Sequence, residues 1–390
     1  MPEKQRILYI LGSYPRWSET FIRRDLTLLL EAGLPLVPVS LLSGDTERRD
    51  DWPEVECLTQ ESHPSAVGGR SAMRWVARLL PRSIRTRLAL RKHAALLQNV
   101  IRAANENDVV HIHAEFADLP GLLGAVAAER LDLPFSLGVH AKDVHEAKFS
   151  PDLIYGRAIF VMACNRSAAE AVRALCPSVA SRVHLIHHGV DLNLFPFAED
   201  PLEPNPHRLL FVGRMVEKKG LDTLLKALAV LRVNRPGARL ILVGDGPLRG
   251  ELQCLADTLD LQNALDWRGV VTPEEVKDIM DQSDVLVMPS RVTREGDRDG
   301  IPNVVLEAMA CGLPVVGTKA GSLDEALTPE TGWPVSRDDS AELASAIECC
   351  LAGRNEADRR RRTAAALVTE RFSAHERITQ RVQLFTQTLA

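Results

Sequence analysis

Short apolar runs alternate with amphipathic stretches along most of the chain, a pattern typical of proteins built on parallel β-sheets. The first half is expected to contain strands at residues 6–11, 36–41, 109–112, 135–139 and 158–163, with helices such as 21–32 and 122–130 between them. The helices between these strands indicate a parallel sheet whose strands are joined by crossover connections. The pattern therefore predicts an α/β fold with a doubly wound sheet.

The alternation is interrupted once, between residues 192 and 207, where four prolines occur and no hydrophobic period is visible. It then restarts, with strands expected at 209–212, 240–243 and 285–288 and a helix expected from Leu221. We therefore predict two Rossmann-like domains, at 1–191 and 208–372, with a linker at 192–207.

Two further helix starts carry a capping box, in which a hydroxyl and an acid three residues later satisfy each other's free amides. Thr272 and Glu275 form one of them, and Ser373 and Glu376 form the other. The second box opens a C-terminal helix with one apolar face, made by Ile378, Val382, Phe385 and Leu389. This face has to be buried against another part of the protein.

Composition narrows the class of protein. The 390 residues, 45% hydrophobic and 25% charged, can bury two cores, and the net charge of −5 gives no overall case for nucleic acid as a partner. Seven cysteines without metal-binding spacing are typical of reduced thiols in the cytosol. The N-terminal apolar stretch is too short for a signal peptide, and the apolar run at 28–42 is interrupted by Glu31 and two prolines. We therefore expect a soluble, cytoplasmic protein.

The most informative segment runs from Ser283 to Val316 and reads SDVLVMPSRVTREGDRDGIPNVVLEAMACGLPVV. It predicts a buried strand, a charged loop, a helix that begins at Pro302 and ends at Gly312, and a second buried strand. Asp299 then lies before a helix whose free amides attract anions, and Glu307 lies within that helix. Two carboxylates beside such a helix start suit a ligand with both hydroxyls and phosphates, as in a nucleotide sugar.

This segment resembles the acid-x7-acid signature of the retaining glycosyltransferases with the GT-B fold, the group called glycosyltransferase family four. Its GDRDGIPN run is similar to that of the subgroup that builds bacterial exopolysaccharides. Asp299 stands where the signature has Glu, so its side chain is one methylene shorter, and Asp297 or Glu295 is a candidate to compensate. The resemblance implies two Rossmann-like domains facing across a cleft, with the helix at 373–390 packed back onto the first domain.

Other matches to the same family are FVGRMVEKKG at 211–220, GVHAKDVHE at 138–146 and PRWSETF at 15–21. The resemblance implies that the catalytic residues are His140, Arg214, Lys219 and Asp299. It implies donor-binding roles for Gly12, Gly213, Arg214, Lys219, Val270, Gly300, Ile301, Pro302, Asn303 and Glu307. On the acceptor side it implies Ser18, Glu19 and Thr20. Cations stabilise the departing diphosphate in this family, so we expect no metal ion and no cofactor.

His111 and His113 share one face of an expected strand and would suit a metal pair. No third ligand occurs at a fixed spacing, and the family commonly has two histidines here. We therefore favour structural histidines that line the cleft.

Three function classes remain open at this point. The favoured one is a hexosyltransferase that moves a sugar, with retention, from a nucleoside-diphosphate sugar to a glycan or lipid-linked oligosaccharide in cell-surface polysaccharide synthesis. The alternative is a GT-B sugar phosphorylase or nucleotide-sugar epimerase, and the third is a nucleotide-binding relative without turnover. Release of free nucleotide that depends on an acceptor separates the first from the others.

One further segment, from residue 62 to residue 105, contains no acid. It carries nine cations, at Arg70, Arg74, Arg78, Arg82, Arg85, Arg87, Arg91, Lys92 and Arg102, with Trp75 and several leucines among them. A basic and apolar surface of this kind suits an anionic membrane. We therefore predict that residues 70–92 hold the protein on the inner face of the membrane. The alternative is an ordinary core helix whose arginines pair with acids elsewhere.

Overall fold

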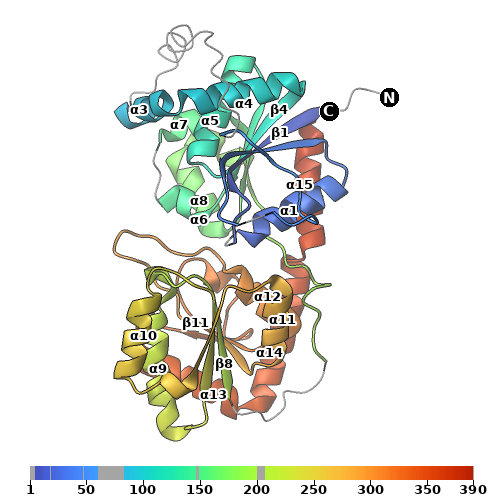
Figure 1. The fold of residues 1–390 in the computed structure, drawn as a ribbon. Coiled ribbons are helices and arrows are strands. Elements are labelled where there is room, and N and C mark those ends of the chain that lie inside the picture. The colour runs from blue at the N-terminus through green and yellow to red at the C-terminus, as the bar shows by residue number, and fades with distance from the viewer. Residues whose placement is uncertain are drawn as a thin grey trace. The chain divides into compact units, whose positions relative to one another are not determined.

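The structure, a computed structural model of the 390-residue chain, describes residues 5–17, 19–46, 48–59, 83–145, 149–199 and 207–389. It divides into two compact units. Unit 1 comprises Met1–His187 and Arg377–Ala390, and unit 2 comprises His188–Glu376 (Figure 1). The chain therefore passes from one unit to the other at His187 and returns after Glu376, whereas the sequence pattern placed the linker at 192–207.

Unit 1 is built on a parallel sheet with the strand order β3-β2-β1-β4-β5-β6-β7. Its strands are β1 (Arg6–Tyr14), β2 (Leu36–Ser43), β3 (Glu56–Cys57), β4 (Val109–Glu115), β5 (Phe135–Val139), β6 (Ala158–Ala163) and β7 (Val183–Leu185). Its helices are α1 (Thr20–Glu31), α3 (Ile84–Lys92), α4 (Ala94–Glu106), α5 (Leu119–Leu131), α6 (Ala141–His145), α7 (Pro151–Ile154), α8 (Arg166–Leu175), the 3-10 helix η1 (Pro177–Arg182) and most of α15 (Ala374–Leu389).

Unit 2 repeats this plan with the order β10-β9-β8-β11-β12-β13. Its strands are β8 (Arg208–Val212), β9 (Arg239–Val243), β10 (Leu265–Gly269), β11 (Val285–Met288), β12 (Val315–Thr318) and β13 (Trp333–Val335). Its helices are α9 (Leu221–Asn234), α10 (Arg249–Thr258), α11 (Pro273–Asp281), α12 (Asn303–Cys311), α13 (Ser340–Ala352) and α14 (Arg354–Arg371), with the 3-10 helices η2 (Glu217–Lys219), η3 (Gln262–Ala264) and η4 (Leu323–Glu325). Helices α9 and α10 cover one face of the sheet, and α11 and α12 cover the other (Figure 1). The predicted doubly wound α/β fold is confirmed.

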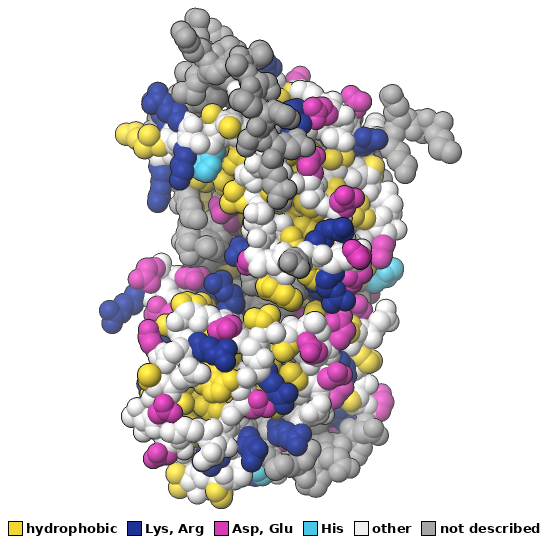
Figure 2. All heavy atoms as spheres, viewed as in Figure 1, with side chains coloured by type: hydrophobic (Ala, Val, Ile, Leu, Met, Phe, Trp, Pro, Cys, Tyr) yellow, Lys and Arg dark blue, Asp and Glu magenta, His cyan; other side chains and the backbone are white. Residues whose placement is uncertain are grey.

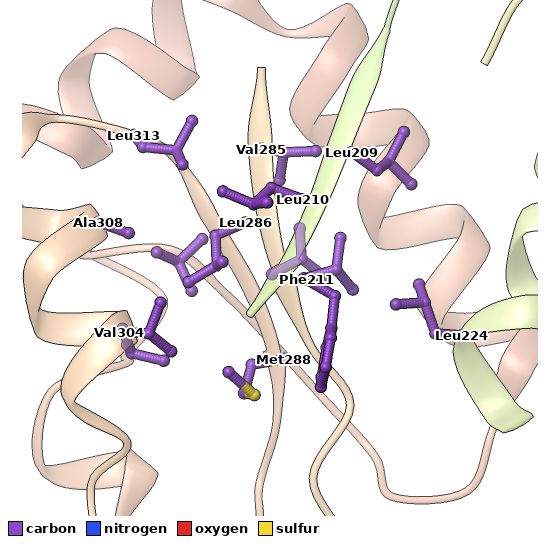
Figure 3. Close-up of a cluster of buried hydrophobic side chains, with 14 of the residues drawn as sticks. Leu209, Leu210, Phe211, Leu224, Val285, Leu286, Met288, Val304, Ala308 and Leu313 are labelled. Carbon is purple, nitrogen blue, oxygen red and sulfur yellow. The ribbon is translucent and has the colours of Figure 1, made fainter. Parts of the chain in front are cut away.

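The core of unit 2 fixes the strand ends that carry its loops. Figure 3 shows Phe211 of β8 and Met288 of β11 between Leu224 of α9 and Val304 and Ala308 of α12. All of these side chains are buried, so the two strands and the two helices form one rigid block. The loops after β8 and β11 therefore start from fixed positions.

The predicted elements are present, but several of them, including β1, β4 and α5, extend beyond their predicted bounds. β1 continues to Tyr14, so Gly12 lies in a strand rather than in a loop. Helix α12 begins at Asn303, and Pro302 is its N-cap residue in an extended conformation, one position outside the helix. The capping box at Thr272 is confirmed, with both of its hydrogen bonds formed.

The C-terminal helix α15 buries its apolar face in unit 1. Ile378 and Phe385 are buried with Tyr9 and Phe160, and Val382 is partly buried beside them. The side chain of Leu389 lies outside the described residues. The end of the chain thus completes the core of the unit that contains its beginning.

The predicted linker belongs to unit 2 as far as it is described. Phe195 is buried in the core of that unit, and the ring of Phe197 lies 5.0 Å from the guanidinium carbon of Arg361. The backbone N–H of Ala198 donates to the carbonyl of Cys311 at 3.1 Å. The two phenylalanines therefore anchor residues 192–199 on unit 2, and residues 200–206 lie outside the described part.

Candidate active site

The carboxyl edge of the unit 2 sheet brings together two segments that are far apart in the sequence. β8 and β11 are neighbours in the sheet although β9 and β10 lie between them in the chain, so the loops that follow them meet at a topological switch point. Nζ of Lys219 lies 2.7 Å from Oδ2 of Asp299. Nζ of Lys218 lies 3.0 Å from Oδ1 of Asp297 and 3.7 Å from Oδ1 of Asp299. We call these four residues the lysine–aspartate cluster.

Glycines allow the backbones around this cluster to approach closely. Gly220 has a left-handed φ of 62°, and a Cβ there would collide with the carbonyl of Pro289. Gly321 also has a φ of 62°, and the carbonyl of Asp299 occupies the place of its Cβ. The hydroxyl of Ser290 donates to Oδ2 of Asp299 at 3.2 Å. Three loops are thereby fixed around one carboxylate.

The lysines of the cluster favour the ionised form of Asp299. Burial alone would raise the pKa of Asp299, but the charges of Lys219 and Lys218 outweigh it and lower that pKa below its ordinary value. The side chains of Lys219 and Asp299 are each 13% exposed, so their charges are only partly screened by water. The cluster therefore holds two ammonium groups in fixed positions against two carboxylates.

The other residues predicted to bind the donor lie around the same edge. Gly300, Ile301 and Pro302 lead from Asp299 into α12, whose N-terminal amides favour anions, and Asn303 is its first residue. Glu307 lies further along α12 and is half-buried. Gly213 and Arg214 directly follow β8. Arg214 is exposed and forms no ion pair with the described residues, and Val270, just after β10, is 54% exposed.

The sequence did not indicate a role for Arg291, which links the loop after β11 to the start of α9 and to the segment before α13. Its Nη2 lies 2.5 Å from Asp222 and 2.8 Å from Thr223, both near the start of α9, and its Nε lies 2.8 Å from Asp338, before α13. Lys218 was missed as well, because a second lysine beside Lys219 is equally typical of a solvated turn. No spacing rule distinguishes Arg291 from the other arginines of its loop.

In unit 1 the corresponding switch point lies between β1 and β4. Gly12 is part of β1, Glu19 is the N-cap residue of α1 and Thr20 is the first residue of that helix. Ser18 lies outside the described residues. Burial raises the pKa of Glu19, although the guanidinium of Arg16, 3.1 Å away, opposes this shift.

His140 directly follows β5 and is 9% exposed. Its ring stacks on Phe116 with the centroids 4.3 Å apart and lies 5.4 Å from the ring of Phe21. Burial alone would lower the pKa of His140, but interactions with Cys164 and Glu115 outweigh it and raise that pKa well above the usual range. The predicted sugar-contacting histidine is therefore a buried ring that packs against two aromatic side chains.

His111 and His113 make the contacts of structural residues. Each ring has one nitrogen 2.7 Å from the hydroxyl of Ser136, and both rings are fully buried. Burial is the main cause that lowers their pKa values, to about 3 for His111, so both rings are neutral. These contacts fit the interpretation of the pair as part of the interior of the sheet.

Comparison with known proteins places this architecture in a family. Residues 206–353 match the family described as "Glycosyl transferases group 1", and residues 49–194 match "Glycosyltransferase Family 4". The putative colanic acid biosynthesis glycosyltransferase WcaL of Escherichia coli is 25% identical over 365 residues, which cover 88% of this chain and 89% of that protein. The amylovoran biosynthesis glycosyltransferase AmsK of Erwinia amylovora is 24% identical over 372 residues, with the same coverage.

Solved structures agree on the fold. Anabaena HepE, crystallised with UDP and glucose, superimposes with a TM-score of 0.74 at 20% identity over 97% of this chain and 99% of HepE. The sucrose-phosphate synthase of Thermosynechococcus elongatus gives a TM-score of 0.73 at 21% identity over 99% of each chain.

The chain belongs to the glycosyltransferases, with a Family 4 region in its first half and a group 1 region in its second half. Its two Rossmann-like units form the GT-B fold, as the sequence predicted. None of the helices in the described ranges is long and apolar enough to span a bilayer.

Proposed function

We propose that this glycosyltransferase moves a hexosyl group, with retention, from a nucleoside-diphosphate sugar to a glycan or lipid-linked oligosaccharide during the synthesis of a cell-surface polysaccharide. The observation that carries this proposal is the lysine–aspartate cluster at the switch point of unit 2, directly before the N-terminus of α12. Ligands with phosphates bind at such edges of doubly wound sheets. The names of WcaL and AmsK, both from exopolysaccharide pathways, and the UDP bound by HepE support the donor and the pathway.

In this proposal the basic and the acidic residues have different roles. Lys219 and Arg214 stabilise the diphosphate as it departs, because fixed cations favour the state in which negative charge has developed most. Glu307 accepts hydrogen bonds from the ribose hydroxyls, and Asp299 holds the lysines in place. His140 donates a hydrogen bond to the transferred sugar. This set of charges requires neither a metal ion nor a cofactor.

A phosphorylase or an epimerase would use the same cations, but the relatives give these alternatives no support. A phosphorylase would replace the acceptor by inorganic phosphate. An epimerase would return the nucleotide sugar without releasing nucleotide. Both alternatives therefore differ from the proposal in what the enzyme releases.

Among UDP, GDP, ADP and CDP, we expect one to raise the melting temperature by several degrees, with EDTA present throughout. A nucleotide at a concentration about 100-fold above its Kd stabilises the folded protein by about 2.7 kcal/mol. The melting temperature of a unit of this size rises by roughly 2–4 °C for each kcal/mol. The sugar conjugates of that nucleotide should then release it only when an acceptor is present. Release of sugar phosphate in the presence of inorganic phosphate, or binding without any turnover, would contradict the proposal.

The membrane contact belongs to the same proposal, and α3 supports it. Ile84 and Leu88 lie one helical turn apart and are 73% and 59% exposed. Their cationic neighbours on α3 are also exposed and form no ion pair with the described residues, namely Arg85, Arg87, Arg91 and Lys92. Figure 2 shows basic and hydrophobic side chains gathered at the end of unit 1 where α3 lies. Residues 70–82, which the prediction also includes, lie outside the described part.

Vesicles of phosphatidylglycerol should co-sediment with the protein at low salt and release it as the salt concentration rises. Each cation near such a surface adds about 1 kcal/mol, so changing Arg85, Arg87 and Arg91 to Glu should reduce vesicle binding by at least about 100-fold. A matched control changes three exposed cations of unit 2, Lys226, Arg239 and Arg268, to Glu. Equal losses in the two triple variants, or no binding at low salt, would refute a membrane surface on α3.

A further inference from the structure

The carboxylate of Glu115, at the end of β4, fills a closed space beside His140. Its side chain is 1% exposed. Glu115 is the register partner of Gly138 on β5, and a Cβ at residue 138 would overlap the Glu115 carboxylate. The absence of a side chain at Gly138 therefore leaves space for the Glu115 carboxylate. Gly138 lies two residues before His140, and Nε2 of His140 lies 3.9 Å from Oε1 of Glu115.

The hydrogen atoms on one side of Glu115 can be assigned because an ionised carboxylate only accepts hydrogen bonds. Oε2 of Glu115 lies 3.3 Å from Nε2 of His113, so that nitrogen carries the hydrogen. Nδ1 of His113 is then an acceptor, and the hydroxyl of Ser136, 2.7 Å away, donates to it. The Ser136 oxygen in turn accepts from Nε2 of His111 at 2.7 Å. A chain of hydrogen bonds with a single direction thus ends on Glu115.

The other side of Glu115 is held by the last helix. Arg381 of α15 has a side chain that is 4% exposed, with Nη2 3.2 Å from Asp25 of α1 and Nη1 3.7 Å from Oε1 of Glu115. Burial alone would raise the pKa of Glu115, but His113, His140 and Arg381 outweigh it and lower that pKa well below its usual range. Glu115 is therefore a buried carboxylate that lies beside two basic groups, the guanidinium of Arg381 and the ring of His140.

We propose that Glu115 is a positioning residue for His140 and that Arg381 fixes Glu115 from the last helix. This inference rests on the proposed function, in which His140 contacts the transferred sugar. The carboxylate holds the imidazole in one orientation against the rings of Phe21 and Phe116 and favours its protonated form. The last helix thereby acts on the reaction without touching the substrate.

Several groups of unit 1 besides Glu115 influence the charge of His140, so the test has to isolate Glu115. They are His113 on β4, Cys164 after β6, Asp143 on α6 and Glu19 before α1. Glu115→Gln preserves the size of the side chain and removes only its charge. We expect it to lower kcat at least about tenfold and to change KM for the donor less than about twofold, as for other groups that orient a reacting side chain.

The direction in which the pH profile of kcat moves distinguishes a role for Glu115 from a general structural defect. A raised pKa means that His140 stays protonated until the pH passes that value, so turnover falls on the alkaline side. Without the anion the pKa drops, and in Glu115→Gln the alkaline limb of kcat should move to lower pH. The titration of the His140 ring, followed by NMR in the protein without substrates, should move in the same direction.

Ser40→Ala is the matched control, because it removes a buried hydroxyl from β2 of the same sheet and leaves His113, Glu115, Arg381 and His140 in place. It should shift neither the alkaline limb nor the titration of His140. Arg381→Met should reproduce part of the loss in kcat, and Arg381→Lys, which keeps the charge, should restore it. Equal losses in the two Arg381 variants would show that α15 acts through packing alone.

Two outcomes overturn the inference and one overturns the proposed function instead. The first is that the His140 ring titrates at the same pH in wild type and in Glu115→Gln. The second is that the ring titrates in the ordinary histidine range in the wild type. Either result would show that Glu115 does not act on His140. The second of these measurements needs no variant, so it decides the matter even where Glu115→Gln does not fold. His140→Ala with normal turnover would instead show that His140 does not contact the reacting sugar, whatever Glu115 does to its titration.

Discussion

Lys219→Ala should lower turnover by about 100- to 1000-fold and raise the Kd of the donor by less than about tenfold. The ammonium group is held 2.7 Å from Asp299 at the switch point of unit 2, so it is already in place when the glycosidic bond breaks. Negative charge on the diphosphate is then at its highest, and a fixed cation stabilises that state more than the bound ground state. Steady-state rates and calorimetry on the same preparation measure the two effects.

Arg214→Ala should show the same separation of turnover from binding, although Arg214 is exposed and Lys219 is not. Lys226→Ala is the matched control, because Lys226 is an exposed lysine of α9 that pairs only with Asp222, 3.7 Å away within the described residues. Its turnover should stay within about twofold of wild type. Near-normal turnover in both Lys219→Ala and Arg214→Ala would refute the assignment of these residues to the diphosphate.

Local patterns in the sequence were enough to predict the elements that carry the site. The capping box at Thr272 and the left-handed Gly312 at the end of α12 depend on a few neighbouring residues, so they can be identified without the fold. The positions of the buried strands along the chain are equally local, because their apolar runs are short and bounded by turns. The family resemblance then supplied the roles of residues within these elements.

Contacts between distant segments were not predictable in the same way. Lys218 pairs with Asp297, and Arg381 reaches Glu115, but each pair depends on which strands become neighbours in a sheet. The packing of residues 192–199 onto unit 2 also depends on contacts between distant segments. Prolines indicate an irregular segment, and the buried Phe195 shows that such a segment can still be anchored on a domain by one ring.

The position of Asp299 also changes how the acidic pair is understood. The resemblance identifies Asp299 as a shortened form of the first acid of the signature, with a catalytic role. The structure shows its carboxylate occupied by Lys219, Lys218 and Ser290, all within unit 2. Asp299 therefore has a direct part in holding the cations, and the half-buried Glu307 is the better candidate for a carboxylate that binds the donor's hydroxyls.

Glu307→Gln should accordingly raise the Kd of the donor at least about tenfold, because a charge-assisted hydrogen bond contributes roughly 1.5–3 kcal/mol. Glu251→Gln, an exposed acid on α10, should leave the Kd unchanged. Unchanged calorimetric binding by Glu307→Gln would contradict its role. Asp299→Glu restores the length found in the family, and since the longer acid can still reach Lys219, we expect turnover to stay within severalfold of wild type or to rise. Loss of turnover in Asp299→Glu with unchanged folding would mean that the shorter acid sets the position of Lys219. The length of the side chain at residue 299 would then determine where the ammonium group meets the diphosphate.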